Sequence, residues 1–323
     1  MCLGIGGCGK TTFVKQMKII HGVSWDESEK ERFVQLIRRN YLLVLGDILS
    51  AIQRLKLNLS EEGQKNADRI KELLKDRECS IKDNIAVLKS VWEDPTVQDL
   101  VTNHKEQINA PLISYFWEHV DRVMSDTYVP TEDDILRVRV RTAGAYSTTV
   151  YVKPEYFEFF DVGGQKPERS KWEKVLSTHK FSCVIFFVAT DEWDVKDEER
   201  EFDATKLEMS KIIFTEVTQT EMIDASVPII LFLNRSDLLG ERIKSASGFA
   251  SFKEAYPEYA GEQKAEAVLG FIKDRFLEGV NRKKDGMKHY VTNALDKNSM
   301  TPVFNAVKTY ILTSSLSSAG VDY

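Results

Sequence analysis

The pattern of apolar positions divides this chain into a helical stretch and a surrounding region where strands and helices alternate. From about Trp25 to Thr127 no segment alternates as a strand does. Apolar residues instead recur at steps of three and four, which places them on one face of a helix. This stripe consists of Phe33, Ile37, Tyr41, Val44, Ile48, Ile52 and Leu55. Such a stripe is more typical of a core seam than of a ligand site, so we expect an all-α domain here.

The region after Pro130 has apolar runs that are separated by segments of helical spacing. The continuous runs at 183–188 and 228–233 predict strands that are buried on both faces of a parallel sheet. Further strands are predicted at 1–3 and 156–160, and helices at 206–214, 265–276 and 300–311. This alternation predicts an α/β fold with a doubly wound parallel sheet, in which ligands bind at the carboxyl ends of the strands.

Composition and charge narrow the class of protein. The 323 residues are 42% hydrophobic and 29% charged, which is ordinary for a globular protein and long enough for two domains. We expect an α/β domain of residues 1–22 and 131–323, interrupted by a helical domain at 23–130. The net charge of −6 gives no support for nucleic-acid binding. The four cysteines form no C-x-x-C pair, which favours reduced thiols, and no apolar run is long enough to cross a bilayer.

A glycine-rich segment near the first residue carries the strongest chemical signal. Its sequence is Gly4-Ile5-Gly6-Gly7-Cys8-Gly9-Lys10-Thr11, which matches the phosphate-loop pattern G-x-x-x-x-G-K-[ST] at every fixed position. In such a loop, backbone N–H groups surround a phosphate, the lysine reaches the β and γ phosphates, and the hydroxyl binds Mg²⁺. The alternative is a glycine-rich turn before an ordinary helix. The loop indicates phosphate binding and leaves the base and the reaction open.

A second candidate segment, Asp161-Val162-Gly163-Gly164-Gln165, directly follows a predicted strand. An aspartate at this place holds Mg²⁺ through water, and a glycine N–H approaches a γ phosphate closely because no side chain intervenes. A neighbouring glutamine orients an attacking water. The D-x-x-G pattern is weak alone, since a strand-ending turn has the same sequence. Its position downstream of a phosphate loop strengthens the prediction.

Two segments after later strands are candidates for reading the base. Asn234-Arg235-Ser236-Asp237 ends an apolar run. A carboxylate there can accept hydrogen bonds from the N1–H and the exocyclic amine of guanine. Adenine presents a different pattern of donors and would be selected against. An Asx turn that closes the strand is the alternative. Thr292-Asn293-Ala294-Leu295 ends the next predicted strand, where the Ala294 N–H would meet the guanine O6. This last segment is uninformative alone.

A basic segment, Arg137 to Thr142, lies where the helical region returns to the sheet. A basic stretch is usually a solvated face. Arg139 is nevertheless a candidate for stabilising charge on a transferring phosphoryl group, and Thr142 for a second Mg²⁺ hydroxyl ligand. The spacing does not decide between these interpretations.

Taken in this order, the segments resemble the α subunit of a heterotrimeric G protein. The matching segments are Gly4–Thr11, Arg139–Thr142, Asp161–Gln165, Asn234–Asp237 and Thr292–Ala294. Phe13–His21 is also similar to the first helix of that family, and Tyr128–Thr131 with Asp134–Arg137 to a later segment. The resemblance covers nearly the whole chain. It implies a P-loop Ras-like GTPase domain with a mostly parallel six-stranded sheet, plus an inserted all-α domain that small Ras-like GTPases lack.

The resemblance implies a molecular switch that binds GTP or GDP with Mg²⁺ and hydrolyses GTP. Arg139 would be an internal arginine finger, and Gln165 would position the attacking water. Thr11 and Thr142 would bind the metal ion, and Asp161 would reach it through water. The nucleotide-binding set would be Gly4, Gly6, Gly7, Cys8, Gly9, Lys10, Thr11, Thr12, Leu136, Arg137, Gly164, Asn234, Arg235, Asp237 and Ala294.

The resemblance also implies partners and a location. The partners would be a βγ dimer, a seven-transmembrane receptor, an effector and a regulator that accelerates GTP hydrolysis. The family's N-terminal helix binds βγ and carries lipid, and most of it is missing from this sequence. We therefore expect the full protein at the cytoplasmic face of the plasma membrane, and a soluble chain without that helix. Leu136 and Arg137 would lie on the ribose side of the nucleotide.

The sequence departs from the family at several positions. The family usually has Glu and Ser where Gly7 and Cys8 stand, and that Glu commonly pairs with the arginine finger. It usually has Lys in place of Arg235, and often Asp-Ser in place of Pro111-Leu112. These changes suggest a weaker clasp between the domains and faster GDP release. Compensation by other residues is an equal alternative.

Two other functional classes remain open. One is an ATP-dependent P-loop kinase or ATPase, against which Asn234 and Asp237 count because a guanine-reading carboxylate has no use in an adenine site. The other is a non-catalytic nucleotide-binding scaffold, against which the presence of Arg139 and Gln165 counts.

Overall fold

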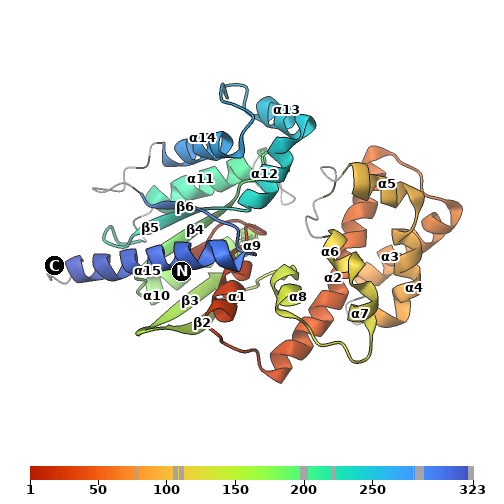
Figure 1. Ribbon diagram of the computed structural model, residues 1–323, viewed down its shortest axis with the longest axis horizontal. Coiled ribbons are helices and arrows are strands. Elements are labelled where there is room, and N and C mark those ends of the chain that lie inside the picture. The colour runs from red at the N-terminus through yellow and green to blue at the C-terminus, as the bar shows by residue number, and fades with distance from the viewer. Residues whose placement is uncertain are drawn as a thin grey trace. The chain divides into compact units, whose positions relative to one another are not determined.

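The chain forms two compact units in the computed structural model (Figure 1). The α/β unit comprises Met1–Ser24 and Arg141–Tyr323, and the helical unit comprises Trp25–Val140. The structure describes residues 1–76, 79–104, 108, 113–196, 203–219, 221, 223–278, 280 and 287–318. The helical unit thus extends ten residues beyond the boundary expected at 130. The reason lies in helix α8 (Glu132–Arg137), whose buried Asp134 bonds to Arg122 and Tyr115 of the same unit.

The α/β unit alternates strands and helices along the chain, as its apolar pattern predicts. Its strands are β1 (Cys2–Leu3), β2 (Ala145–Val152), β3 (Glu155–Val162), β4 (Val184–Ala189), β5 (Ile229–Asn234) and β6 (His289–Val291). Its helices are α1 (Lys10–Ile20), α9 (Lys166–Arg169), α10 (Trp172–Thr178), α11 (Lys206–Gln219), α12 (Ser236–Lys244), α13 (Ala246–Ala255), α14 (Ala265–Leu277) and α15 (Lys297–Ser318).

The six strands form one sheet in the order β2-β3-β1-β4-β5-β6. All neighbouring pairs are parallel except β2 and β3, which form an antiparallel hairpin. The prediction of a mostly parallel six-stranded sheet is therefore confirmed. The edge strand β2 carries no continuous apolar run because most of its residues are exposed or half-buried, which explains why sequence patterning did not indicate it.

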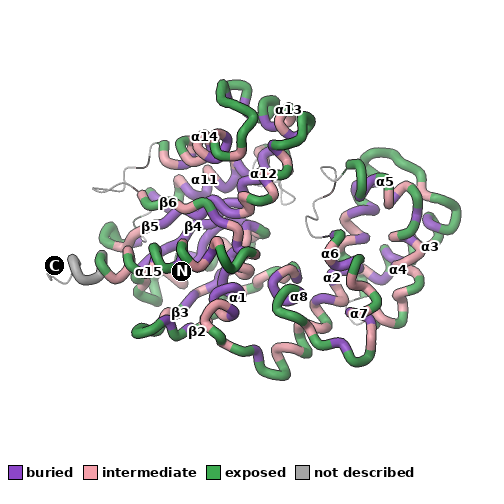
Figure 2. Tube along the Cα trace, in the orientation of Figure 1, coloured by how far each residue is buried: buried purple, intermediate pink, exposed green. Residues whose placement is uncertain are grey.

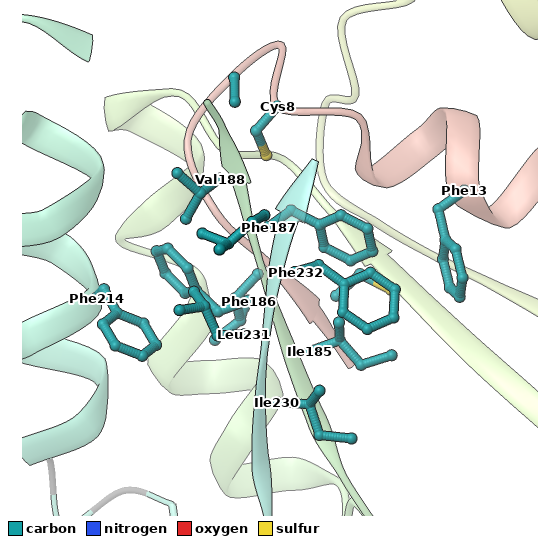
Figure 3. Close-up of a cluster of buried hydrophobic side chains, with 14 of the residues drawn as sticks. Cys8, Phe13, Ile185, Phe186, Phe187, Val188, Phe214, Ile230, Leu231 and Phe232 are labelled. Carbon is teal, nitrogen blue, oxygen red and sulfur yellow. The ribbon is translucent and has the colours of Figure 1, made fainter. Parts of the chain in front are cut away.

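The central strands β4 and β5 are buried at every position, as Figure 2 shows. Successive side chains point to opposite faces of the sheet. Phe187 and Phe232 pack on one face against Phe13 of α1, and Phe186 packs on the other face against Phe214 of α11 (Figure 3). Apolar cores therefore cover both faces, and they hold the carboxyl ends of the strands and the start of α1 in fixed positions.

The helical unit is built around the long helix α2 (Glu27–Leu55). A capping box opens this helix, in which Asp26 accepts from the Glu29 N–H and Glu29 accepts from the Asp26 N–H. The other elements are α3 (Glu61–Lys75), a short 3₁₀ helix (Lys82–Asn84), α4 (Ile85–Trp92), α5 (Pro95–Asn103), α6 (Ile113–Glu118), α7 (Val120–Met124) and α8. Of the predicted apolar stripe, four residues lie in this unit's core and two pack against it, whereas Leu55 is exposed. Across the described ranges of both units, no helix has the length and apolar character that a bilayer span requires.

Candidate functional site

The predicted phosphate loop connects β1 to α1, at the carboxyl end of a central strand. Its last glycine, Gly9, is the N-cap of α1 and has φ +103°, a backbone conformation that favours glycine. A Cβ atom at Gly9 would lie 2.1 Å from Nδ2 of Asn234. The glycine is therefore required by both its backbone conformation and its neighbour, and the loop leads directly into a helix N-terminus of the kind that binds phosphate.

Lys10 is buried and lies over the loop that precedes it. Its Nζ donates to the carbonyl oxygens of Gly4 at 2.8 Å and Ile5 at 2.9 Å, and it lies 3.7 Å from Sγ of Cys8. Burial raises the pKa of the Cys8 thiol, so Cys8 is neutral in this setting and contributes packing rather than charge. The loop thus presents one cation at the place where the sequence predicts phosphate binding.

Three oxygen-bearing side chains from distant parts of the sequence meet beside the loop. Thr11 Oγ1 donates to Asp161 Oδ2 at 2.6 Å and lies 2.8 Å from Thr142 Oγ1. Thr142 Oγ1 is also 3.4 Å from Asp161 Oδ2. Asp161 Oδ1 is buried and has no hydrogen-bond partner within the described part of the chain. Burial raises the pKa of the Asp161 carboxyl, against the opposing effects of Lys10 and the two hydroxyls.

The segment that follows Asp161 packs directly on the phosphate loop. A Cβ atom at Gly164 would lie 2.3 Å from the Gly4 carbonyl oxygen and 2.5 Å from Lys10 Nζ, so only glycine fits there. Gln165 is the N-cap of α9, and its Cγ would lie 3.0 Å from a Cβ at Gly6. The structure therefore brings the two predicted motifs together, with Gln165 next to the loop.

Asn234 ties the end of β5 to two other segments. Its Nδ2 donates to the Cys8 carbonyl at 2.9 Å, and its Oδ1 accepts from Thr292 Oγ1 and the Ala294 N–H, both at 3.1 Å. Asn234 thus links the phosphate loop to the loop after β6, and both ends of its amide are used within the protein. The Ala294 N–H, expected at a guanine O6, donates to this amide in the structure.

Arg235 and Asp237 occupy the turn into α12. Arg235 has φ +64° and is largely buried, and its guanidinium donates to Asp191 Oδ2 at 2.7 Å and Glu192 Oε1 at 2.9 Å. Asp237 is exposed in the first turn of α12. Burial raises the pKa of Asp191 to about 6, although Arg235 opposes that shift. Asp191 and Glu192 thus fix the side chain of Arg235. This residue lies in the sequence between Asn234 and Asp237, which are predicted to read the base.

Comparison with known proteins identifies the family. The family model described as G-protein alpha subunit matches residues 1–311. The guanine nucleotide-binding protein alpha-2 subunit of Dictyostelium discoideum is 33% identical over 330 residues, covering 99% of this chain and 90% of that protein. The alpha-16 subunit of Caenorhabditis briggsae is 33% identical over 329 residues, with the same two coverages. The chain belongs to the G-protein α subunit family.

Within this Gα chain, the helical unit holds three of the predicted site residues on and just after α8. The scaffold for them is Asp134, whose fully buried carboxylate accepts a bidentate pair from Arg122 and further bonds from the Tyr115 and Tyr128 hydroxyls and the Thr131 N–H. These bonds hold the pKa of Asp134 far below its usual range despite burial. The first turn of α8 is thereby fixed in position.

Leu136 and Arg137 come at the end of α8. Leu136 is buried, whereas Arg137 lies over the ring of Tyr115, with its guanidinium carbon 4.5 Å from the ring centre, and pairs with Asp133. Arg139 follows two residues later in the helical unit, partly exposed, with its guanidinium near Asp47. The expected roles of these residues at the ribose and the γ phosphate remain predictions.

Two further predicted positions lie within the described residues, and two lie outside them. Thr12 is half-buried in the first turn of α1, and Gly7 is exposed, with no atom within 4 Å of a Cβ built on it. Pro111 and Leu112 lie outside the described residues, so the predicted weakening of the clasp between domains stays a prediction.

Sequence reasoning missed several residues that hold predicted site residues in place within each unit. Asp191 and Glu192 come one residue after the end of β4, and their place near the carboxyl end of a buried strand is the signal that could have indicated them. Asp134 and Arg122 had no such signal, because a buried ion pair between two helices leaves no pattern in sequence spacing. Asn40, a buried polar residue of α2, was missed because its bond to the Arg139 carbonyl joins residues far apart in the sequence.

Proposed function

We propose that this chain hydrolyses GTP at the site formed by the phosphate loop, the Asp161–Gln165 segment and the Asn234–Asp237 turn. As a G-protein α subunit it belongs to a class of guanine-nucleotide-binding GTPases that act as signal transducers. Membership in this class favours the switch over an ATP-dependent enzyme or a non-catalytic scaffold. The observation that carries the assignment of residues is the meeting of Thr11, Thr142 and Asp161, three residues far apart in sequence.

The donor set fits Mg²⁺. Two hydroxyls and a carboxylate are hard oxygen ligands, and Asp161 Oδ1 is a buried polar atom without a partner in the part of the chain described here. Mg²⁺ is usually held by one or two carboxylates together with substrate phosphates and water. When bound, the ion would neutralise charge on the β and γ phosphates.

The residues of this chain supply positioning and charge rather than covalent chemistry. The loop N–H groups and Lys10 bind the phosphates, and the Gly164 N–H senses the γ phosphate. Gln165 orients the attacking water in line with the bond that breaks. Arg139 stabilises the charge that develops on the phosphoryl oxygens, and Asp237 selects guanine through its carboxylate.

The test of the catalytic assignment is single-turnover GTP hydrolysis by Arg139→Ala and Gln165→Leu. We expect both variants to bind GTP with nearly unchanged affinity and to hydrolyse it much more slowly. For the arginine the expected loss is about 10³- to 10⁵-fold, a range for which Gα proteins are themselves among the reference cases. Wild-type hydrolysis rates in both variants would contradict the assignment.

A separate test addresses base selection. GTP but not ATP is expected to displace a fluorescent guanine nucleotide, and Asp237→Asn is expected to lose that preference. Equal competition by ATP in the wild-type chain would remove Asn234 and Asp237 as base-reading residues.

The partners proposed for this chain follow from its family. They are a βγ dimer, a receptor, an effector and a regulator of hydrolysis, with action at the cytoplasmic face of the plasma membrane. Copurification with a βγ dimer in the presence of GDP, and release on GTP binding, would test the first of these.

A further inference from the structure

The long helix α2 contacts Arg139 at two points on one of its faces. Asn40 Nδ2 donates to the Arg139 carbonyl oxygen at 3.2 Å, and Asp47 Oδ2 lies 3.6 Å from Arg139 Nη1. Positions 40 and 47 are seven residues apart, which is two turns of helix and therefore the same face. One contact is to the main chain of Arg139 and the other is to its side chain.

The main chain around Arg139 is held firmly. Asn40 is 4% exposed, and its Nδ2 also donates to the Leu36 carbonyl at 3.0 Å, so the amide cannot turn away without losing two bonds. Val138 is buried in the core of the helical unit, and Val140 packs against that core. The two valines on either side of Arg139 thus anchor the main chain from which its side chain extends.

The side-chain contact is of a different kind. The side chains of Arg139 and Asp47 are 45% and 43% exposed, and 3.6 Å is longer than a charge-assisted hydrogen bond. The pair is thus an electrostatic contact that favours one direction of a flexible side chain while leaving guanidinium donors for another anion. An exposed pair of this kind has a small energy, which a phosphoryl group would easily exceed.

We propose that Asp47 is a positioning residue that directs the Arg139 guanidinium before GTP hydrolysis. This inference rests on the proposed function of Arg139. The phosphate loop offers no carboxylate for such a role, because residues 4–11 contain none and Gly7 stands at its most exposed point. The counter-charge comes instead from the helical unit that carries Arg139 itself. Asn40 fixes the main chain of Arg139, and Asp47 limits the directions in which the Arg139 side chain extends.

The test is single-turnover GTP hydrolysis with Mg²⁺ at low salt, in wild type, Asp47→Asn and Asp47→Glu. Removing the charge is expected to slow hydrolysis about 1.5- to 5-fold, the size expected for an exposed ion pair, with no change in GTP affinity. Asp47→Glu keeps the charge and is expected to restore most of the rate. The control is Glu31→Gln, which removes an equal charge from the same helix about 24 Å away and is expected to leave the rate unchanged.

Two further measurements separate positioning from a structural effect. At about 1 M salt the rates of wild type and Asp47→Asn are expected to converge, because the Debye length falls to about 3 Å. In an Arg139→Ala background, Asp47→Asn is expected to have no further effect. A slowing that persists at high salt or in that background would overturn the proposal, as would a rate for Asp47→Asn equal to or above wild type. If Arg139→Ala itself hydrolyses GTP at the wild-type rate, the proposed function fails instead.

Discussion

Two buried aspartates, one in each unit, show how differently the two regions of this molecule use the same residue. Asp134 in the helical unit accepts from Arg122, two tyrosine hydroxyls and a backbone N–H, so both of its oxygens are bonded. Asp161 in the α/β unit accepts from Thr11, while its Oδ1 is buried and lacks a hydrogen-bond partner among described residues. Hydrogen bonds within the protein thus satisfy both oxygens of Asp134, whereas among the described residues they satisfy one oxygen of Asp161.

The pKa values of the two groups move in opposite directions for this reason. The bonds to Asp134 outweigh burial and lower its pKa, whereas burial dominates at Asp161 and raises its pKa. The charge on Asp134 therefore stabilises the fold. The charge on Asp161 costs stability until a cation compensates for it. A buried charge that the protein compensates only in part is a sign of a binding site, and a fully compensated one is a sign of a scaffold.

The largest expected effect is the loss of the Asp134 scaffold. Asp134→Ala removes the fully buried acceptor shared by Arg122, two tyrosine hydroxyls and a backbone N–H, so we expect the helical unit to lose about 3–5 kcal/mol of stability. Hydrogen exchange in peptides from α7 and α8 measures this loss. The control is Asp133→Ala, which removes a neighbouring exposed carboxylate and should change stability by less than about 0.5 kcal/mol. Similar exchange in the two variants would contradict the comparison.

The contrast between the two regions also explains what the sequence could predict. The runs at 183–188 and 228–233 predicted β4 and β5 well because a strand buried on both faces is apolar throughout. The site motifs in the α/β unit were visible because a phosphate loop needs fixed residue types at fixed spacing. No such constraint governs Asp134 and its partners.

The unit boundary at Val140 was missed for a related reason. Residues 131–140 follow Pro130 and lead into the sheet, so the change of pattern suggested the α/β domain. Their attachment to the helical unit depends on tertiary bonds to Asp134 and on the burial of Val138, which no local pattern reveals.

The second prediction concerns Asp161, of whose carboxylate one oxygen is hydrogen-bonded among the described residues. Asp161→Asn removes a charge that burial disfavours, so without nucleotide the α/β unit should be as stable as wild type or slightly more stable. With nucleotide present, the extra stabilisation from Mg²⁺ should be largely lost. For wild type that stabilisation is about 2.7 kcal/mol at a ligand concentration 100-fold above Kd.

Thermal or denaturant unfolding with and without Mg²⁺ measures this difference. The matched control is Asp274→Asn, which removes one exposed carboxylate from the same unit and should keep the Mg²⁺ effect. If Asp161→Asn destabilised the nucleotide-free chain as strongly as Asp134→Ala destabilises the helical unit, Asp161 would be a scaffold residue too.

The smallest effect concerns Lys15, a second buried charge in the α/β unit. Burial lowers the pKa of Lys15 to about 7, although Asp161 opposes the shift. The unfolded chain keeps this proton up to a pH near the ordinary value of 10.5, so between pH 7 and 10.5 it binds more protons than the folded chain. Stability should therefore rise with pH in this window, by at most about 1.4 kcal/mol per pH unit.

Lys15→Met isolates this contribution because it removes the titrating group and keeps a long side chain. Between pH 7 and 9, the free energy of unfolding should increase by about 2 kcal/mol more in wild type than in the variant. Urea unfolding at both pH values, followed through the α/β unit, gives the difference. A difference of the opposite sign would mean that Lys15 is as well compensated in the α/β unit as Asp134 is in the helical unit, and the contrast between the two regions would then rest on Asp161 alone.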